Sequence, residues 1–65
     1  MVYTIKWWRD ELKPTGIEYR RLGSASDIEA NVRELVSSPV RAKRVEVHDS
    51  DGLMVACYPK RFGLA

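Results

Sequence analysis

A single cysteine, Cys57, and a single histidine, His48, are the side chains of this sequence best suited to nucleophilic chemistry. A thiolate becomes a catalytic nucleophile when an imidazole lies within hydrogen-bond reach and a third group orients the ring. The strand pattern described below predicts that these two side chains point to opposite faces of a sheet. We therefore interpret Cys57 as a small core residue and His48 as a solvated strand residue.

Asp49 and Asp51 lie beside His48, and oxygen and nitrogen donors of this kind can bind divalent cations. A calcium loop needs more ligands over a longer stretch, usually closed by a glutamate, and no glutamate follows Gly52. The single cysteine excludes an internal disulfide, and the single histidine excludes a Cys/His zinc cage. Turn formation explains both aspartates, so the sequence predicts no metal, no cofactor and no enzymatic activity.

Four predicted strands must position these residues. Alternating apolar side chains predict strands at residues 2–9 and 17–22, joined by a loop that contains Pro14 and Gly16. Two further strands, at residues 44–48 and 53–58, flank a short polar turn.

The turn at residues 49–52 has the pattern Asp-x-Asp-Gly, which is typical of a type I turn with a left-handed glycine and a G1 bulge. This three-residue loop sets a register that places Val45 and Val47 on the same face as Val55 and Cys57. A loop of even length is the alternative, and it would exchange the two faces of residues 53–58.

A helix is predicted at residues 26–37. Ser26 and Glu29 match a capping box, in which two side chains satisfy free backbone N–H groups. The segment Ser38-Pro39 ends the helix because proline disfavours helical geometry in the residue before it. The helix is acidic, whereas the strand after it is basic.

The order of these elements predicts an α+β fold, β-β-α-β-β, with a four-stranded antiparallel sheet and one helix on one face. Strand orders 2-1-3-4 and 1-2-4-3 both satisfy the connections. We expect a single domain over residues 1–58 and a partly disordered tail at 59–65, unless Phe62 and Leu64 dock on the sheet. The predicted core comprises Tyr3, Ile5, Trp7, Ile17, Tyr19, Ile28, Val32, Leu35, Val36, Val45, Val47, Val55 and Cys57.

The order of elements and the closing segment Val45-Glu46-Val47-x-Asp49-x-Asp51-Gly52-Leu53-x-Val55-Ala56 resemble a loose group of short uncharacterised bacterial proteins that end in a similar hairpin. The resemblance covers mainly residues 44–58. It implies a small stand-alone protein and no particular activity.

The chain has 65 residues and a net charge of +2, too small a charge to require an acidic partner. Charged residues interrupt the N-terminal segment, which therefore lacks the apolar stretch of a signal peptide. No apolar run approaches the ~20 residues of a membrane span. We expect a cytoplasmic protein with no membrane partner.

Trp7 and Trp8 are consecutive, so one of them must leave the one-sided core, and we assign Trp8 to the sheet face without a helix. Exposed apolar area of this kind marks interaction sites. Alternatively, Trp8 covers a hairpin edge or lies under the C-terminal tail. The predicted interaction surface comprises Trp8, Leu22, Met54 and Tyr58 with the basic residues Lys6, Arg20, Arg44 and His48. Ala56 lies on the same predicted face, and Glu18 and Glu46 dilute its charge.

Self-association is the first functional hypothesis, as a homodimer through this face or an edge strand, because so short a chain buries little surface alone. Another protein partner fits the same surface. The alternative is binding of single-stranded nucleic acid, with bases stacked on Trp8 and Tyr58 and phosphates near Lys6, Arg20 and Arg44. A small regulatory or antitoxin-like partner protein is compatible with either hypothesis.

Overall fold

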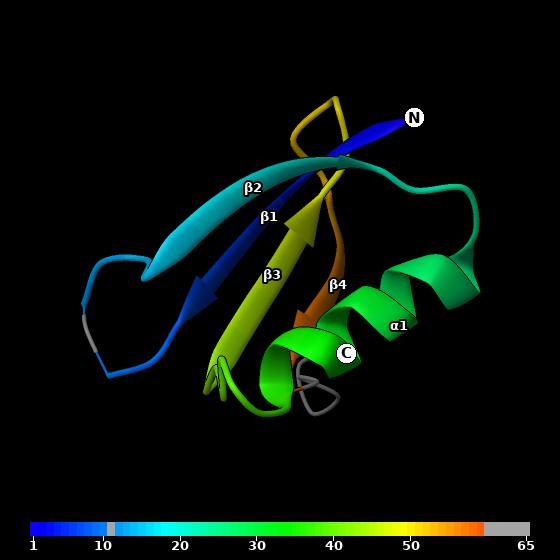
Figure 1. The fold of residues 1–65 in the computed structure, drawn as a ribbon. Helices are drawn as coiled ribbons and strands as arrows, with labels where there is room; N and C mark the ends of the chain where they lie inside the picture. The colour runs from blue at the N-terminus through cyan, green and yellow to red at the C-terminus, as the bar shows by residue number, and fades with distance from the viewer. Residues whose placement is uncertain (11, 60–65) are drawn as a thin grey trace.

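The computed structural model describes residues 1–10 and 12–59, and the tail expected to be disordered lies outside them from residue 60 onward. The elements are β1 (Val2–Trp8), β2 (Gly16–Arg21), α1 (Ala25–Val36), β3 (Arg44–His48) and β4 (Met54–Tyr58). They form an antiparallel sheet of order β2-β1-β3-β4 with α1 on one side (Figure 1). The predicted α+β class is confirmed, and of the two strand orders the first is present. No helix in the described part of the chain is long and apolar enough to cross a membrane.

The N-cap of helix α1 lies two residues before the predicted one. Ser24 is the N-cap, and its Oγ accepts a hydrogen bond of 3.3 Å from the backbone N–H of Asp27. Asp27 Oδ2 in turn accepts one of 3.1 Å from the N–H of Gly23. The predicted pair of Ser26 and Glu29 is therefore wrong, although the same serine-acid chemistry starts the helix.

The core lies between α1 and the strands β1, β3 and β4. Ile5, Val45 and Val47 are fully buried beneath Leu35 of the helix, and Ala42 closes the cluster after α1. Asn31 of α1 is only 5% exposed, and its Oδ1 has no hydrogen-bond partner among the described residues.

The β1–β2 register reverses the predicted faces of β2. Trp7 lies opposite Gly16 and Ile5 opposite Glu18, so the even-numbered residues of β2 share the helix side of the sheet. Ile17 and Tyr19, predicted in the core, lie on the other side and are exposed. The helix packs over β3 and β4, not over the edge strand β2. The helix side of β2 therefore tolerates polar residues.

The turn at residues 49–52 has the predicted geometry, with Gly52 at a φ of 86° and Asp49 N–H bonded to the carbonyl of Leu53 at 2.9 Å. A second irregularity follows it. His48 pairs with Met54, but Val47 pairs with Ala56, which leaves Val55 as an extra residue.

This bulge exchanges the faces of the rest of β4. Ala56 and Tyr58 lie on the helix side, whereas Cys57 lies opposite Glu46 on the other side. The predicted core positions of Val55 and Cys57 are therefore wrong, and so is the predicted outward position of Ala56. The turn residues indicate the loop but contain no signal for an extra residue further along the strand.

Candidate interaction surface

The sheet side opposite α1 is here called the outer face. The strand registers place on it Val2, Thr4, Lys6 and Trp8 of β1, Ile17, Tyr19 and Arg21 of β2, Arg44, Glu46 and His48 of β3, and Met54 and Cys57 of β4. No helix among the described residues covers this side (Figure 1).

Four apolar side chains of the outer face are open to solvent. Tyr19 is 73% exposed, Met54 52%, Ile17 50% and Val2 45%. Tyr19 and Met54 belong to one row across all four strands, in which they are the outer members and Thr4 and His48 the inner ones. Exposed apolar residues thus reach both edges of the sheet.

Trp8 lies on the outer face as predicted, but it is only 9% exposed. Arg44 lies directly opposite on β3, and its guanidinium carbon is 3.9 Å from the centroid of the indole ring. This cation–π contact occupies a face of the ring. The prediction that Trp8 is an exposed apolar anchor is therefore wrong.

The charges at the centre of the outer face are paired with each other. Arg44 Nη2 lies 3.0 Å from Glu46 Oε2, and His48 Nε2 lies 3.9 Å from Glu46 Oε1. Lys6 lies opposite Glu46 but forms no ion pair in the described chain. Three cations (Lys6, Arg21 and Arg44) and one carboxylate (Glu46) give the outer face a formal charge of +2, and Lys6 and Arg21 have no ion pair in the described chain.

The structure brings together on the outer face the predicted residues Lys6, Trp8, Arg44, His48 and Met54. It places the predicted residues Arg20, Leu22 and Tyr58 on the helix side instead. Arg20 pairs there with Glu18 at 3.2 Å. Sequence reasoning missed Ile17, Tyr19 and Cys57. The rejected even-length loop would also have turned Cys57 outward, but the face exchange comes from the bulge at Val55, for which the sequence has no local signal.

Cys57 and His48 share the outer face, contrary to the prediction that they point to opposite faces. The described residues nevertheless contain no thiol–imidazole hydrogen bond. Cys57 Sγ lies 3.7 Å from the carbonyl oxygen of Pro59, and His48 Nε2 faces Glu46. His48 Nδ1 is buried, with no hydrogen-bond partner in the described chain. The geometry is thus not that of an activated nucleophile.

A small groove lies on the helix side, between α1 and β4. Its volume is about 270 Å³, and it is lined by Glu29, Val32, Arg33, Val36, Ala56, Cys57 and Tyr58. This volume is below the usual ~300–1,000 Å³ of sites for small molecules. Tyr58, predicted on the outer face, contributes to this groove instead.

Comparison of the chain with protein-family models, with curated proteins and with solved structures found no match.

Proposed function

We propose that this protein is a small interaction module that self-associates, with the outer faces of two copies packed against each other. The observation that carries the proposal is the exposure of Tyr19, Ile17 and Met54 on a sheet side that no described helix covers. A symmetric dimer places the same patch on both sides of its interface. Each copy would thus supply the apolar surface that covers the other.

The central charges support a protein partner. Arg44 and Glu46 already neutralise each other, so they enter an interface as a preformed pair and need no opposite charge from the partner. The exposed apolar side chains Tyr19 and Met54 lie on either side of this pair, toward the two edges of the sheet.

An approximate energy balance suggests a weak dimer. Burying the exposed half of Ile17, Tyr19 or Met54 contributes roughly 1–1.5 kcal/mol each, or about 6–9 kcal/mol for both copies. Association costs about 4–15 kcal/mol in lost translational and rotational freedom. The net gain is thus at most about 5 kcal/mol, so we expect a dissociation constant in the submillimolar range or weaker.

An edge-to-edge dimer through β4 is a less favoured arrangement. The bulge at Val55 interrupts the regular ladder of β4, and bulges of this kind oppose pairing at a sheet edge.

The test is the solution mass of the untagged protein by sedimentation velocity, from low micromolar to submillimolar concentration, at low and high salt. The wild type should form dimers that persist in high salt. Tyr19→Glu and Met54→Glu should remain monomeric, whereas Leu12→Glu, at a fully exposed position in the β1–β2 loop, should behave as wild type. Monomers at every concentration, or a Tyr19→Glu dimer, would contradict the proposal.

Cys57 supplies a second readout from the same face. Its thiol should react with a thiol reagent faster in dilute protein than in concentrated protein, because the dimer covers it. Tyr19→Glu should abolish this concentration dependence.

Single-stranded nucleic-acid binding on this face remains the alternative function. Tyr58 lies on the helix side and Trp8 is covered by Arg44, so Tyr19 is the aromatic side chain left open for base stacking on the described outer face. A gel shift with mixed single-stranded oligonucleotides at low salt tests it.

A further inference from the structure

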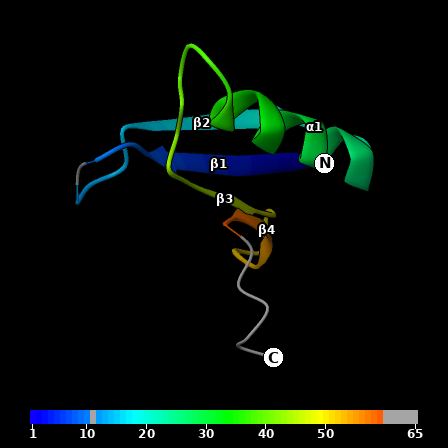
Figure 2. The same cartoon turned by 90° about the horizontal axis from the view of Figure 1, so that it is seen from below.

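A group of basic residues lies at the end of the molecule where β1 ends and β3 begins, and we call it the basic end. It comprises Arg9, Lys13, Arg41 and Lys43. The β1–β2 loop and the loop after α1 both leave the sheet at this end, away from the β3–β4 turn, and their tips point in different directions (Figures 1 and 2). Two contacts join the loops: Lys43 N–H donates to the carbonyl of Trp8 at 2.8 Å, and Lys43 Nζ lies 2.7 Å from Asp10 Oδ1.

Backbone hydrogen bonds join the two ends of the β1–β2 loop and anchor the loop after α1. In the β1–β2 loop, Thr15 N–H donates to the carbonyl of Trp7 at 2.7 Å, and Arg9 N–H donates to Thr15 Oγ1 at 2.9 Å. In the other loop, the buried Ala42 donates its N–H to the carbonyl of Leu35 at 2.9 Å. The two cations that flank Ala42 are therefore presented from a fixed backbone.

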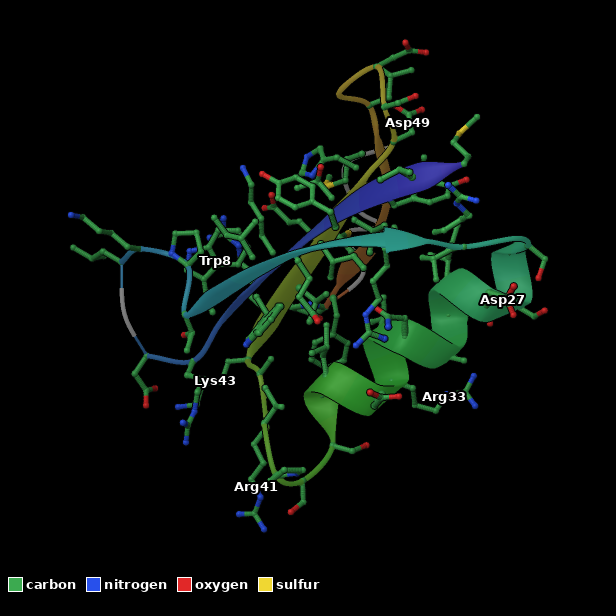
Figure 3. All side chains as sticks on the ribbon, turned by 45° about the horizontal axis from the view of Figure 1, so that its top comes forward. Trp8, Asp27, Arg33, Arg41, Lys43 and Asp49 are labelled. Atoms are coloured by element: carbon green, nitrogen blue, oxygen red, sulfur yellow. The ribbon has the colours of Figure 1, made fainter. Side chains whose placement is uncertain are left out.

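Arg41 has an unusual backbone conformation. Its φ is 52°, in the left-handed region that glycine and asparagine adopt far more readily than other residues. Its N–H is bonded to the carbonyl of Ser37 at 2.8 Å, and its side chain extends away from the sheet (Figure 3). A strained residue with an exposed charge supports a functional role for that charge.

Most cations of the basic end are free. Arg9, Lys13 and Arg41 make no ion pair in the part of the chain that the structure describes, and Lys43 pairs with Asp10. Counted with Asp10 and Glu11 from the sequence, the formal charges of this end sum to +2, which equals the net charge of the whole chain.

We propose that the basic end binds the phosphate backbone of double-stranded nucleic acid without sequence preference. Three cations without an ion pair in the described chain, carried on two loops, suit a repeating array of phosphates, and Arg9 and Arg41 each offer a forked donor to a phosphate. The end carries no exposed aromatic ring among its described residues, and single-strand binding usually depends on such rings. Duplex backbone is therefore the better match.

A lipid surface fits this end less well. Polybasic lipid-binding segments usually contain four to eight cations, whereas here two acidic residues offset four basic ones. Leu12 is the one large apolar side chain exposed in the described part of the β1–β2 loop, and a single apolar anchor holds a protein only weakly on a membrane. The proposal does not depend on self-association, because the basic end and the outer face share no residue.

The experiment is fluorescence anisotropy with a labelled duplex of about 20 base pairs over a series of salt concentrations. The logarithm of the binding constant should fall with the logarithm of salt with a slope of about −2.7, from three phosphate contacts. Arg41→Asn should reduce this slope by about one and weaken binding several-fold at low salt. Arg41→Lys should retain the slope, and Asp10→Asn, which frees Lys43, should bind more tightly.

Two controls separate this effect from unfolding and from net charge. Asparagine tolerates the left-handed backbone, so Arg41→Asn should melt no lower than wild type. Arg33→Asn removes the same charge from the exposed side of α1 (Figure 3) and should bind as wild type. Tyr19→Glu, which tests the outer face, adds one negative charge far from the basic end. It should therefore weaken duplex binding less than Arg41→Asn does.

Four results would overturn the proposal: no duplex binding at low salt, tighter binding of single strands than of duplex, equal loss in Arg33→Asn and Arg41→Asn, or a slope unaffected by Arg41→Asn. A lipid partner would give a different result. The protein would bind phosphatidylserine vesicles but no duplex, and Leu12→Ser would abolish the vesicle binding.

Discussion

Individual side chains at the surface of this protein are held by neighbours on adjacent strands and loops. Arg44 illustrates this, because it stacks on Trp8 across the β1–β3 pair and also forms an ion pair with Glu46. Arg44 thereby covers an aromatic ring, and the carboxylate of Glu46 neutralises its positive charge. A residue that looks like a phosphate ligand in the sequence is thus committed to contacts within the sheet.

Asp10 provides a pH-dependent contribution at the residue scale. The hydrogen bond from Lys43, together with its positive charge, holds the pKa of this carboxyl below its ordinary value of 3.8. Because the folded pKa is lowered, the ion pair stabilises the fold fully above pH 3.8 and loses its effect as the pH falls through the folded value. Wild type should therefore unfold at a higher temperature than Asp10→Asn near neutral pH, by a small margin that disappears in acid.

Thermal melts of both proteins across this pH range, at low and high salt, provide the measurement. High salt should reduce the margin because the pair is exposed. Lys43→Gln should lose the same margin as Asp10→Asn, and the double variant should lose no more. A margin that grows in acid would contradict this assignment.

At the scale of elements, the pairing of β1 with β2 depends on the absence of a side chain at position 16. A Cβ built on Gly16 would overlap Cζ2 of the Trp7 indole, which lies directly over the glycine. An aromatic ring that covers a glycine on the neighbouring strand compensates for the missing side chain. This contact fixes Trp7 against the edge strand.

Gly16→Ala should therefore destabilise the protein by about 1–3 kcal/mol, since the ring or the strand must move. Urea denaturation measures the loss, and near-ultraviolet circular dichroism should show a change in the tryptophan environment. Combining Gly16→Ala with Trp7→Leu should cost less than the sum of the single changes, because the smaller side chain leaves room for the methyl group. Strict additivity would show that the overlap is not the cause.

At the scale of the whole molecule, the helix covers only half of the sheet. A chain of this size buries only about 60% of the surface that it exposes when unfolded, so its stability depends on any further burial. The outer face and the basic end occupy different parts of the molecule, which lets a dimer present two basic ends at once.

If folding and self-association are coupled, the melting temperature should rise with protein concentration. Above the dissociation constant we expect about 3–6 °C for each tenfold increase. Calorimetry over a hundredfold range measures this rise, and Tyr19→Glu should melt at one temperature throughout. A wild-type melting temperature independent of concentration would contradict a dimer that stabilises the fold.

Local sequence signals predicted the elements of this protein well. Alternating apolar residues, the proline after α1 and the Asp-x-Asp-Gly turn are properties of short segments, and the four strands, the helix and the geometry of Gly52 agree with them. The open face of the sheet also follows from the number of elements, because one helix cannot cover both sides.

The composition of that face was decided by tertiary structure. In strands a shift of one residue exchanges all side chains between faces, so the register of β2 and the bulge at Val55 moved Tyr19 and Cys57 outward and Tyr58 inward. Neither feature has a local sequence signal, because each depends on how neighbouring strands and the helix pack. The strand order was likewise open, because both predicted orders satisfy the same connections. In the structure the order is β2-β1-β3-β4, with α1 packed on β3 and β4.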